Sequence, residues 1–193
     1  MSTLLVMAGG TGGHVMPALA AARELKSRGV EVVWLGTREG LESRLVPAAG
    51  FDLEWIKVSG LRHSGWRRKL TMPLMLANAG AQALRVILRR RPDGLLGMGG
   101  FVAGPGGAVG ALLRLPLVIH EQNAVAGLTN RLLARIATRV LLGFPKSEGF
   151  ARKKTRWVGN PVRRSIAALP APEERLADRN GALRVLVIGG SQG

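Results

Sequence analysis

The sequence predicts an α/β protein with a Rossmann-like parallel sheet and helices on both of its faces. Short apolar segments of strand length alternate with longer segments of helix-forming residues along most of the chain. Glycine-rich segments follow several of the apolar segments, as they do where a βαβ unit turns from strand to helix. Hydrophobic residues make up 47% of the 193 residues, which is enough to bury a core without disulfides or metals.

The first half of the chain is predicted to form four strands separated by three helices. The predicted strands cover residues 4–7, 31–35, 53–58 and 94–98, and the predicted helices cover 18–28, 41–49 and 70–88. Gly29 is a typical helix C-cap, and we expect Pro73 to disturb the start of the third helix. Right-handed crossovers between parallel strands then place helices on both faces of the sheet.

The middle of the chain contains a 20-residue stretch without charge, residues 94–113, which has the length of a membrane-spanning helix. It holds eight glycines and Pro105, so we predict a buried strand followed by a glycine loop over residues 99–107 instead. Further strands are predicted at 117–119, 140–142 and 157–158, with a helix at 126–136.

The domain organisation follows from the proline-rich segment Leu169-Pro170-Ala171-Pro172. We predict a first domain over residues 1–169 and a linker over 170–182. Residues 183–193 are predicted to form a strand and a glycine loop that begin a second, truncated domain.

The charge of the chain is strongly positive, with 28 Lys and Arg against 12 Asp and Glu, or +16. Residues 57–92 contain basic residues and no acidic ones, and Glu148 is the single acid within 122–170. Such blocks indicate a polyanionic partner: nucleic acid, an anionic membrane or a phosphorylated substrate. Alternatively, the positive charge reflects an organism whose proteins are generally rich in arginine. The absence of cysteine excludes disulfides, thiolate zinc sites and a cysteine nucleophile.

The first glycine loop, Gly9-Gly10-Thr11-Gly12-Gly13, lies between a predicted strand and a helix, where backbone N–H groups bind phosphate. It is not a dinucleotide fingerprint, because Val15 stands where the third glycine should be and Leu35-Gly36-Thr37-Arg38 lacks the ribose-binding acid. A nicotinamide dehydrogenase is therefore excluded. A tight turn without a ligand is the alternative for any one such loop.

Polar residues accompany these loops at the same predicted sheet edge. His14 follows the first loop and is a candidate general base, or alternatively a helix cap. His120, Glu121, Gln122 and Asn123 end the buried strand at 117–119. Four polar residues there require partners or a ligand, so they predict either a polar cleft or an internally bonded turn.

Five motifs stand in the order found in a known family. They are Gly9-Gly10-Thr11-Gly12-Gly13-His14 with Pro17, residues 97–107, His120-Glu121-Gln122-Asn123, Gly159-Asn160-Pro161-Val162-Arg163, and Gly189-Gly190-Ser191-Gln192-Gly193. In these motifs the chain resembles the MurG family of peptidoglycan N-acetylglucosaminyltransferases over essentially its whole length. The resemblance implies the N-terminal domain of a GT-B fold, in which two Rossmann-like domains face each other across a cleft.

The resemblance also implies a reaction. It is the inverting transfer of N-acetylglucosamine from UDP-N-acetylglucosamine to the C4 hydroxyl of the muramyl sugar of lipid I, giving lipid II for peptidoglycan synthesis. No metal and no cofactor is implied, and the sequence contains no Asp-x-Asp motif. Because most of the second domain is missing, we expect the chain alone to show little or no activity.

The family's site residues are carried over to matching positions. His14 matches the proposed general base. Donor-contacting positions match Thr11, Gly12, Gly13, Asn123, Arg163 and Ser191. The proposed binders of the acceptor pyrophosphate match Gly10, Gly99, Gly100, Gly104, Gly106 and Gly107. His120, Glu121 and Gln122 are expected to line the polar cleft.

A lipid-linked acceptor requires contact with the bilayer, and one segment has a suitable composition. Residues 66–76 interleave large apolar and cationic side chains, which suits the headgroup region. We predict a membrane patch of Trp66, Arg67, Arg68, Lys69, Met72, Leu74 and Met75. The alternative is a core helix with a solvated basic start. The predicted location is peripheral, at the cytoplasmic face of the bacterial inner membrane.

Two other functions remain open from the sequence. Another GT-B transferase with a lipid or glycoside acceptor would use similar loops. A nucleic-acid-binding module would explain the charge of +16, but few aromatic residues are available to stack on bases. We therefore expect no nucleic-acid partner.

Overall fold

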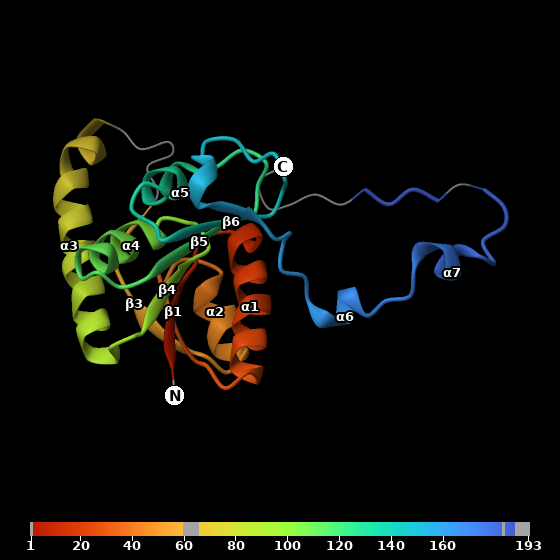
Figure 1. Ribbon diagram of the computed structural model, residues 1–193, viewed down its shortest axis with the longest axis horizontal. Coiled ribbons are helices and arrows are strands. Elements are labelled where there is room, and N and C mark those ends of the chain that lie inside the picture. The colour runs from red at the N-terminus through yellow and green to blue at the C-terminus, as the bar shows by residue number, and fades with distance from the viewer. Residues whose placement is uncertain (1, 60–65, 183, 188–193) are drawn as a thin grey trace.

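The computed structural model describes residues 2–59, 66–182 and 184–187, together with all side chains in these ranges except those of residues 66–70 and 152. Among the described residues, one seven-stranded sheet lies at the centre and helices flank it (Figure 1). The strands are β1 (Thr3–Met7), β2 (Glu31–Gly36), β3 (Asp52–Trp55), β4 (Gly94–Gly97), β5 (Leu117–Glu121), β6 (Arg139–Leu142) and β7 (Thr155–Trp157). The helices are α1 (Gly12–Ser27), α2 (Glu42–Ala48), α3 (Trp66–Arg90), α4 (Ala103–Leu112), α5 (Leu128–Leu133), α6 (Arg164–Ala167) and α7 (Pro172–Leu176), with a 3-10 turn at Arg152–Lys154.

The sheet is parallel throughout, with the strand order β3-β2-β1-β4-β5-β6-β7. The chain reverses its direction of winding between β3 and β4, so β1 and β4 are neighbours at the point where strand order switches. Ligands of open parallel sheets bind beside such a switch point, outside the carboxyl ends of the strands. The predicted parallel α/β fold is confirmed.

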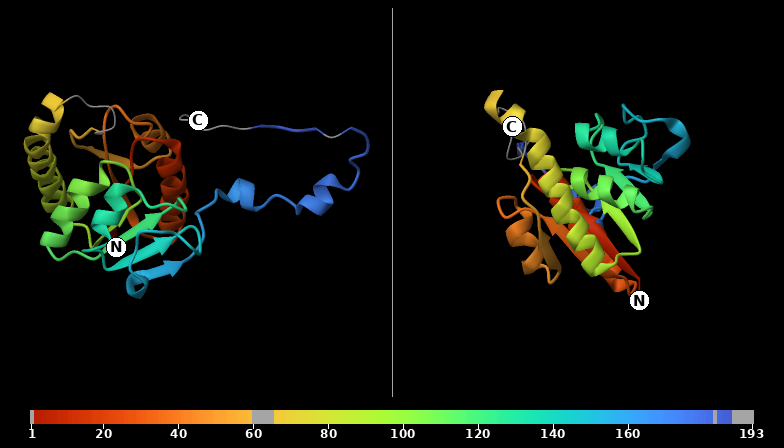
Figure 2. Two further views of the ribbon diagram at one scale, coloured as in Figure 1. Left: turned by 90° about the horizontal axis from the view of Figure 1, so that it is seen from above. Right: turned by 90° about the vertical axis from the view of Figure 1, so that its left-hand side faces the viewer.

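The core consists of two layers because side chains alternate across the strands. Leu5 and Met7 of β1 pack on the face covered by α3, α4 and α5, whereas Val6 packs on the face covered by α1 and α2. Figure 2 shows the two helix layers on opposite sides of the sheet.

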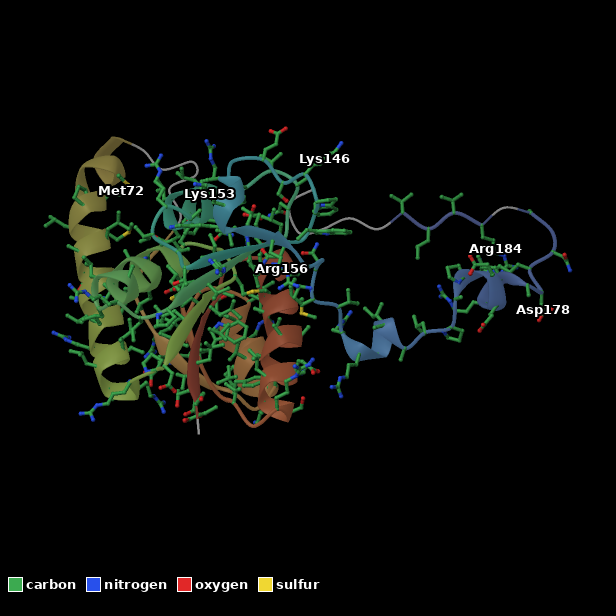
Figure 3. All side chains as sticks on the ribbon, in the orientation of Figure 1. Met72, Lys146, Lys153, Arg156, Asp178 and Arg184 are labelled. Carbon is green, nitrogen blue, oxygen red and sulfur yellow. The ribbon has the colours of Figure 1, made fainter. Side chains whose placement is uncertain are left out.

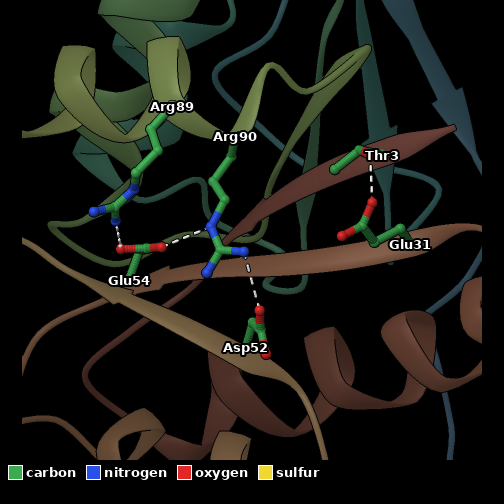
Figure 4. Close-up of polar contacts among 6 residues, drawn as sticks. All are labelled: Thr3, Glu31, Asp52, Glu54, Arg89 and Arg90. Atoms are coloured by element: carbon green, nitrogen blue, oxygen red, sulfur yellow. Dashed lines mark hydrogen bonds and ion pairs between the residues drawn. The ribbon is translucent and has the colours of Figure 1, made fainter.

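Polar contacts join the last residues of α3 to the edge strand β3 (Figure 4). Arg89 and Arg90 both donate to the carboxylate of Glu54, and Arg90 also forms an ion pair of 3.1 Å with Asp52. These contacts fix the carboxyl end of α3 and lie at the opposite end of that helix from the predicted membrane patch.

Three helices begin earlier than predicted: α3 begins at Trp66 and continues through Pro73, and α1 and α4 begin within glycine-rich segments. Helix α1 starts at Gly12 rather than residue 18, because Thr11 has an extended backbone and Pro17 removes only one internal hydrogen bond. Helix α4 starts at Ala103, inside the segment predicted to be a loop. Pro105 is its third residue, where the missing N–H is not needed.

Other boundaries differ more modestly. Strand β5 continues to Glu121, so His120 and Glu121 belong to the strand and not to a turn. Helix α5 ends at Leu133, three residues before the predicted end.

The segment after β7 runs away from the sheet as an extended arm (Figures 1 and 2). It carries the short helices α6 and α7, the second of which lies within the predicted linker. Residues 184–187 are exposed and form no strand, because no described strand lies beside them to supply hydrogen bonds. The rest of the predicted second domain, residues 183 and 188–193, lies outside the described residues, and the domain division stays a prediction.

Candidate functional site

The predicted site residues approach one another because β1, β4 and β5 are adjacent in the sheet. The first glycine loop follows β1, the second glycine segment follows β4, and the polar residues end β5. Three motifs that are far apart in the sequence therefore meet at the carboxyl edge of the sheet.

His14 lies in the first turn of α1 and packs against the second glycine segment. Its Nδ1 is 3.3 Å from Thr11 Oγ1. A Cβ atom built on Gly99 would lie 2.7 Å from His14 Nε2, and Gly99 has a φ of +97°. Only glycine at this position allows the imidazole ring to lie so close to the backbone.

The electrostatics of His14 favour the neutral ring. Burial lowers the pKa of His14 below its ordinary value, while the negative charge of Glu121 offsets part of this effect. When Nδ1–H donates to Thr11 Oγ1, the lone pair is on Nε2, the nitrogen beside Gly99. His14 can then accept a proton from a group bound at this edge.

The two glycine segments touch directly through their backbones. A side chain at Gly100 would collide with the carbonyl oxygen of Gly9, and Gly100 has a φ of +83°. This close approach holds the turn after β4 against the turn after β1, and His14 is positioned where they meet.

The remaining glycines of the second segment belong to helix packing. Gly106 and Gly107 are buried in α4, where a Cβ would come within 2.5 Å of Met7 Sδ at the first position and 2.9 Å of Leu133 Cδ2 at the second. Gly104 lies at the start of α4, and its Cβ would make an ordinary contact of 3.6 Å with Thr129. The sequence-based loop thus divides into a turn at Gly99 and Gly100 and a helix packed tightly on the sheet.

The Gly10 N–H group, a predicted pyrophosphate ligand, already has a partner. It donates to Glu42 Oε2 at 2.9 Å. Glu42 is fully buried and also accepts hydrogen bonds from Thr37. The sequence analysis did not identify Glu42, because its burial depends on residues from separate parts of the chain and no local pattern separates it from an exposed acid such as Glu39.

The polar end of β5 is organised around the buried carboxylate of Glu121. Its oxygens accept hydrogen bonds from the backbone and side-chain N–H groups of Asn123, from Gly127 N–H and from the Asn130 side chain, at 2.8–3.1 Å. Asn130 is a second residue that sequence analysis missed. Glu121 therefore fixes the turn after β5. Its hydrogen bonds with Asn123 hold that residue at the edge of the sheet.

His120 and Gln122 connect this strand to the arm after β7. His120 Nε2–H donates to the Gly159 carbonyl at 2.9 Å, which leaves Nδ1 to accept from Gln122 Nε2 at 3.1 Å. Burial lowers the pKa of His120, in agreement with this neutral form. The Asn160 side chain donates to the Gln122 carbonyl at 3.1 Å. Two acceptor oxygens, Gln122 Oε1 and Asn130 Oδ1, are buried without a protein partner among the described residues.

Two predicted donor-binding residues are not brought to this site by described contacts. Arg163 is exposed at the start of α6, and the neighbouring Arg164 forms an ion pair of 2.6 Å with Glu24 of α1. Ser191 lies outside the described residues.

The predicted membrane patch coincides with the start of α3. Leu74 is 74% exposed, but Met75 packs partly on the core, so Met75 contributes less to an outer surface than predicted. The side chains of Trp66, Arg67, Arg68 and Lys69 lie outside the description. In the described part of the chain, no helix combines the length and hydrophobicity that a membrane span requires.

Comparison with known proteins gives concordant matches. A sequence profile described as the glycosyltransferase family 28 N-terminal domain matches residues 4–142. The chain is 57% identical to a protein of Thiobacillus denitrificans and 56% identical to one of Dechloromonas aromatica. Both are named UDP-N-acetylglucosamine–N-acetylmuramyl-(pentapeptide) pyrophosphoryl-undecaprenol N-acetylglucosamine transferase; each match covers 99% of this chain, and 54% and 53% of the two relatives.

A solved structure agrees with these relatives. The crystal structure of Acinetobacter baumannii MurG superposes with a TM-score of 0.77 at 36% identity, over 94% of this chain and 50% of that protein. The chain thus spans about half the length of the proteins it matches.

Proposed function

The chain belongs to glycosyltransferase family 28, and on this premise we propose that it forms the amino-terminal half of an inverting N-acetylglucosaminyltransferase. The donor is UDP-N-acetylglucosamine, the acceptor is the C4 hydroxyl of the muramyl sugar of lipid I, and the products are lipid II and UDP. The observation that carries the proposal is the position of the His14 ring, between the two touching glycine segments at the switch point of the sheet. The names of the relatives support this choice of substrates.

The chemistry assigned to His14 is general base catalysis. In the proposed reaction, His14 Nε2 removes the proton from the acceptor hydroxyl as its oxygen forms a bond to the anomeric carbon of the donor sugar. The bond from that carbon to the diphosphate breaks on the opposite side, so UDP leaves with the electron pair and the configuration inverts. Burial keeps His14 neutral before reaction, and the nearby Glu121 charge stabilises the imidazolium that forms.

The segments at the carboxyl edge of the sheet are assigned separate roles in binding the acceptor and the donor. We assign the acceptor pyrophosphate to the turn at Gly99 and Gly100 and the amino end of α4, where backbone N–H groups and the helix dipole favour anions. Thr11, Gly12, Gly13 and Asn123 stand at the same edge and are assigned to the donor. Arg163 and Ser191 complete the donor set only once the second half of the enzyme is in place.

Transfer can be tested with a chimera that joins residues 1–193 to the remaining half of the Thiobacillus denitrificans relative. We expect it to transfer labelled N-acetylglucosamine to a lipid I analogue and not to diacylglycerol. The unjoined chain should transfer neither. A folded chimera that accepts diacylglycerol, or no acceptor at all, would contradict the proposal.

The same proposal places the protein on the membrane surface, at the cytoplasmic face of the bacterial inner membrane. Figure 3 shows that Met72, Lys153 and Lys146 lie along one end of the molecule, which is also the end where the strands finish. The first turns of α3 and the second basic block are therefore at one end of the molecule, which supports a common docking surface for anionic lipid.

Co-sedimentation with anionic vesicles tests this docking surface. We expect the triple variant Arg67→Glu/Arg68→Glu/Lys69→Glu to lose binding, since each basic residue near an anionic surface contributes about 1 kcal/mol. A matched control, Arg175→Glu/Arg179→Glu/Arg184→Glu, changes the net charge equally on the exposed arm. Equal loss in both variants would show that only total charge matters.

A further inference from the structure

Glu42 is a buried carboxylate that has no part in the chemistry assigned above. It is 0% exposed at the start of α2 and accepts three hydrogen bonds, from Gly10 N–H at 2.9 Å, Thr37 N–H at 2.9 Å and Thr37 Oγ1 at 2.8 Å. No basic side chain within the described ranges is paired with it. An ionised carboxylate is an acceptor only, so all three donors suit it.

The surrounding backbone is built to admit this carboxylate. A Cβ on Gly9 would lie 2.6 Å from Glu42 Oε1, and a Cβ on Gly36 would lie 2.7 Å from Glu42 Cγ. A Cβ on Gly40 would collide with the carboxylate itself. Glycines from two segments, Gly9 after β1 and Gly36 and Gly40 just before α2, therefore leave room for this side chain.

The carboxylate acts on the loop that carries the proposed base. Gly10 has a φ of +90°, its N–H donates to Glu42, and its carbonyl accepts from Leu41 N–H at 3.4 Å. The next residue, Thr11, is the N-cap of α1 and contacts the His14 ring. A continuous path thus leads from Glu42 to His14 through the hydrogen bond to Gly10, the peptide bond between Gly10 and Thr11, and the contact of Thr11 with His14.

We propose that Glu42 is a positioning residue, which holds the Gly10 peptide and thereby fixes His14 against Gly99. It occupies the place that an anionic ligand would take at Gly10, so a bound diphosphate meets the amides of later residues instead. The kinetic consequence of this proposal rests on the proposed function, whereas its structural part does not.

Amide hydrogen exchange in the 193-residue chain tests the structural part. In Glu42→Gln the side-chain oxygen stays with the two Thr37 donors, and the new NH₂ group faces Gly10 N–H, which breaks that bond. We expect exchange at Gly10 to be faster by roughly tenfold or more, because hydrogen bonds to charged groups are the stronger ones. Exchange at Thr11–His14 should rise with it.

The matched control is Glu24→Gln, which makes the same substitution on α1 but at a partly exposed ion pair. Its exchange at Gly10–His14 should equal that of the wild type. If Glu42→Gln fails to fold, Glu42→Asp keeps the charge on a side chain one methylene shorter and should speed exchange at the same amides. Wild-type exchange at Gly10–His14 in a folded Glu42 variant would overturn the proposal.

The kinetic part uses the chimera. Glu42→Gln should lower kcat by roughly tenfold or more, because small misplacements of catalytic groups are costly, and should leave the KM for UDP-N-acetylglucosamine within about twofold. If Glu42 had only a structural role, Glu42→Gln would reduce the amount of folded enzyme, and the kcat of the folded fraction would not fall. An inactive wild-type chimera would defeat the proposed function, while the exchange result would still decide the role of Glu42. An active chimera whose kcat is insensitive to Glu42→Gln would overturn the positioning role alone.

Discussion

The two glycine segments follow neighbouring strands and have similar compositions, but their glycines do different things. In the first segment, Gly9 and Gly10 give room and backbone freedom for a turn that Glu42 holds and His14 follows. In the second, Gly106 lets α4 approach the sheet closely and Gly107 lets it approach Leu133 of α5, whereas Gly99 and Gly100 form the turn that lies against His14 and Gly9. A glycine-rich stretch after a strand therefore indicates close approach of the backbone, either to a ligand or to the protein's own core.

The largest effect on activity is expected for substitution of His14, which follows the first glycine segment. In the chimera, His14→Ala should lower kcat by about 10²–10⁴-fold, the usual contribution of general base catalysis, with little change in the KM for the donor. His14→Asn is the informative partner, because its amide can still bond to Thr11 but cannot take up a proton. Recovery of activity by His14→Asn would mean that His14 acts only as a helix cap.

The contact between the segments gives the next effect. Gly100→Ala combines a positive φ with a collision against the Gly9 backbone, and should destabilise the fold by about 3 kcal/mol. Gly10→Ala has a similar φ of +90° but no atom within 4 Å of the new Cβ, and should cost only about 1 kcal/mol. Urea unfolding measures both. Equal losses of unfolding free energy in the two variants would show that the contact between Gly100 and Gly9 does not stabilise the fold.

The packing role of α4 predicts the smallest effect. Gly110→Ala should destabilise by about 1 kcal/mol, because collision with Leu95 outweighs the gain in helix propensity. Gly80→Ala on α3 is the matched control, since its Cβ would meet only Val109 Cγ2 at 3.7 Å, and it should be neutral or stabilising. In thermal unfolding, the Tm should fall for Gly110→Ala and should stay equal or rise for Gly80→Ala. Stabilisation by Gly110→Ala would contradict the packing role.

Strands β1, β2, β4, β5 and β6 were predictable because each contains an apolar run that ends in glycine or polar residues. The starts of α1 and α4 were not, because tertiary packing overrides the low helix propensity of glycine at positions such as Gly106 and Gly107. His14 and the polar end of β5 stood out locally. Glu42 did not, because its contact with Gly9 and its hydrogen bond from Gly10 exist only when the fold brings the first glycine segment beside α2.

The pH dependence of kcat/KM for the acceptor in the chimera tests the role of His14 most directly. Because the pKa of His14 is lowered by burial, the base form is available at neutral pH and is lost as the pH falls through that lowered pKa. We predict a kcat/KM that is constant near neutral pH and declines on the acidic side, with this decline absent from the residual activity of His14→Asn. An acidic decline that is identical in the wild type and in His14→Asn would contradict the account.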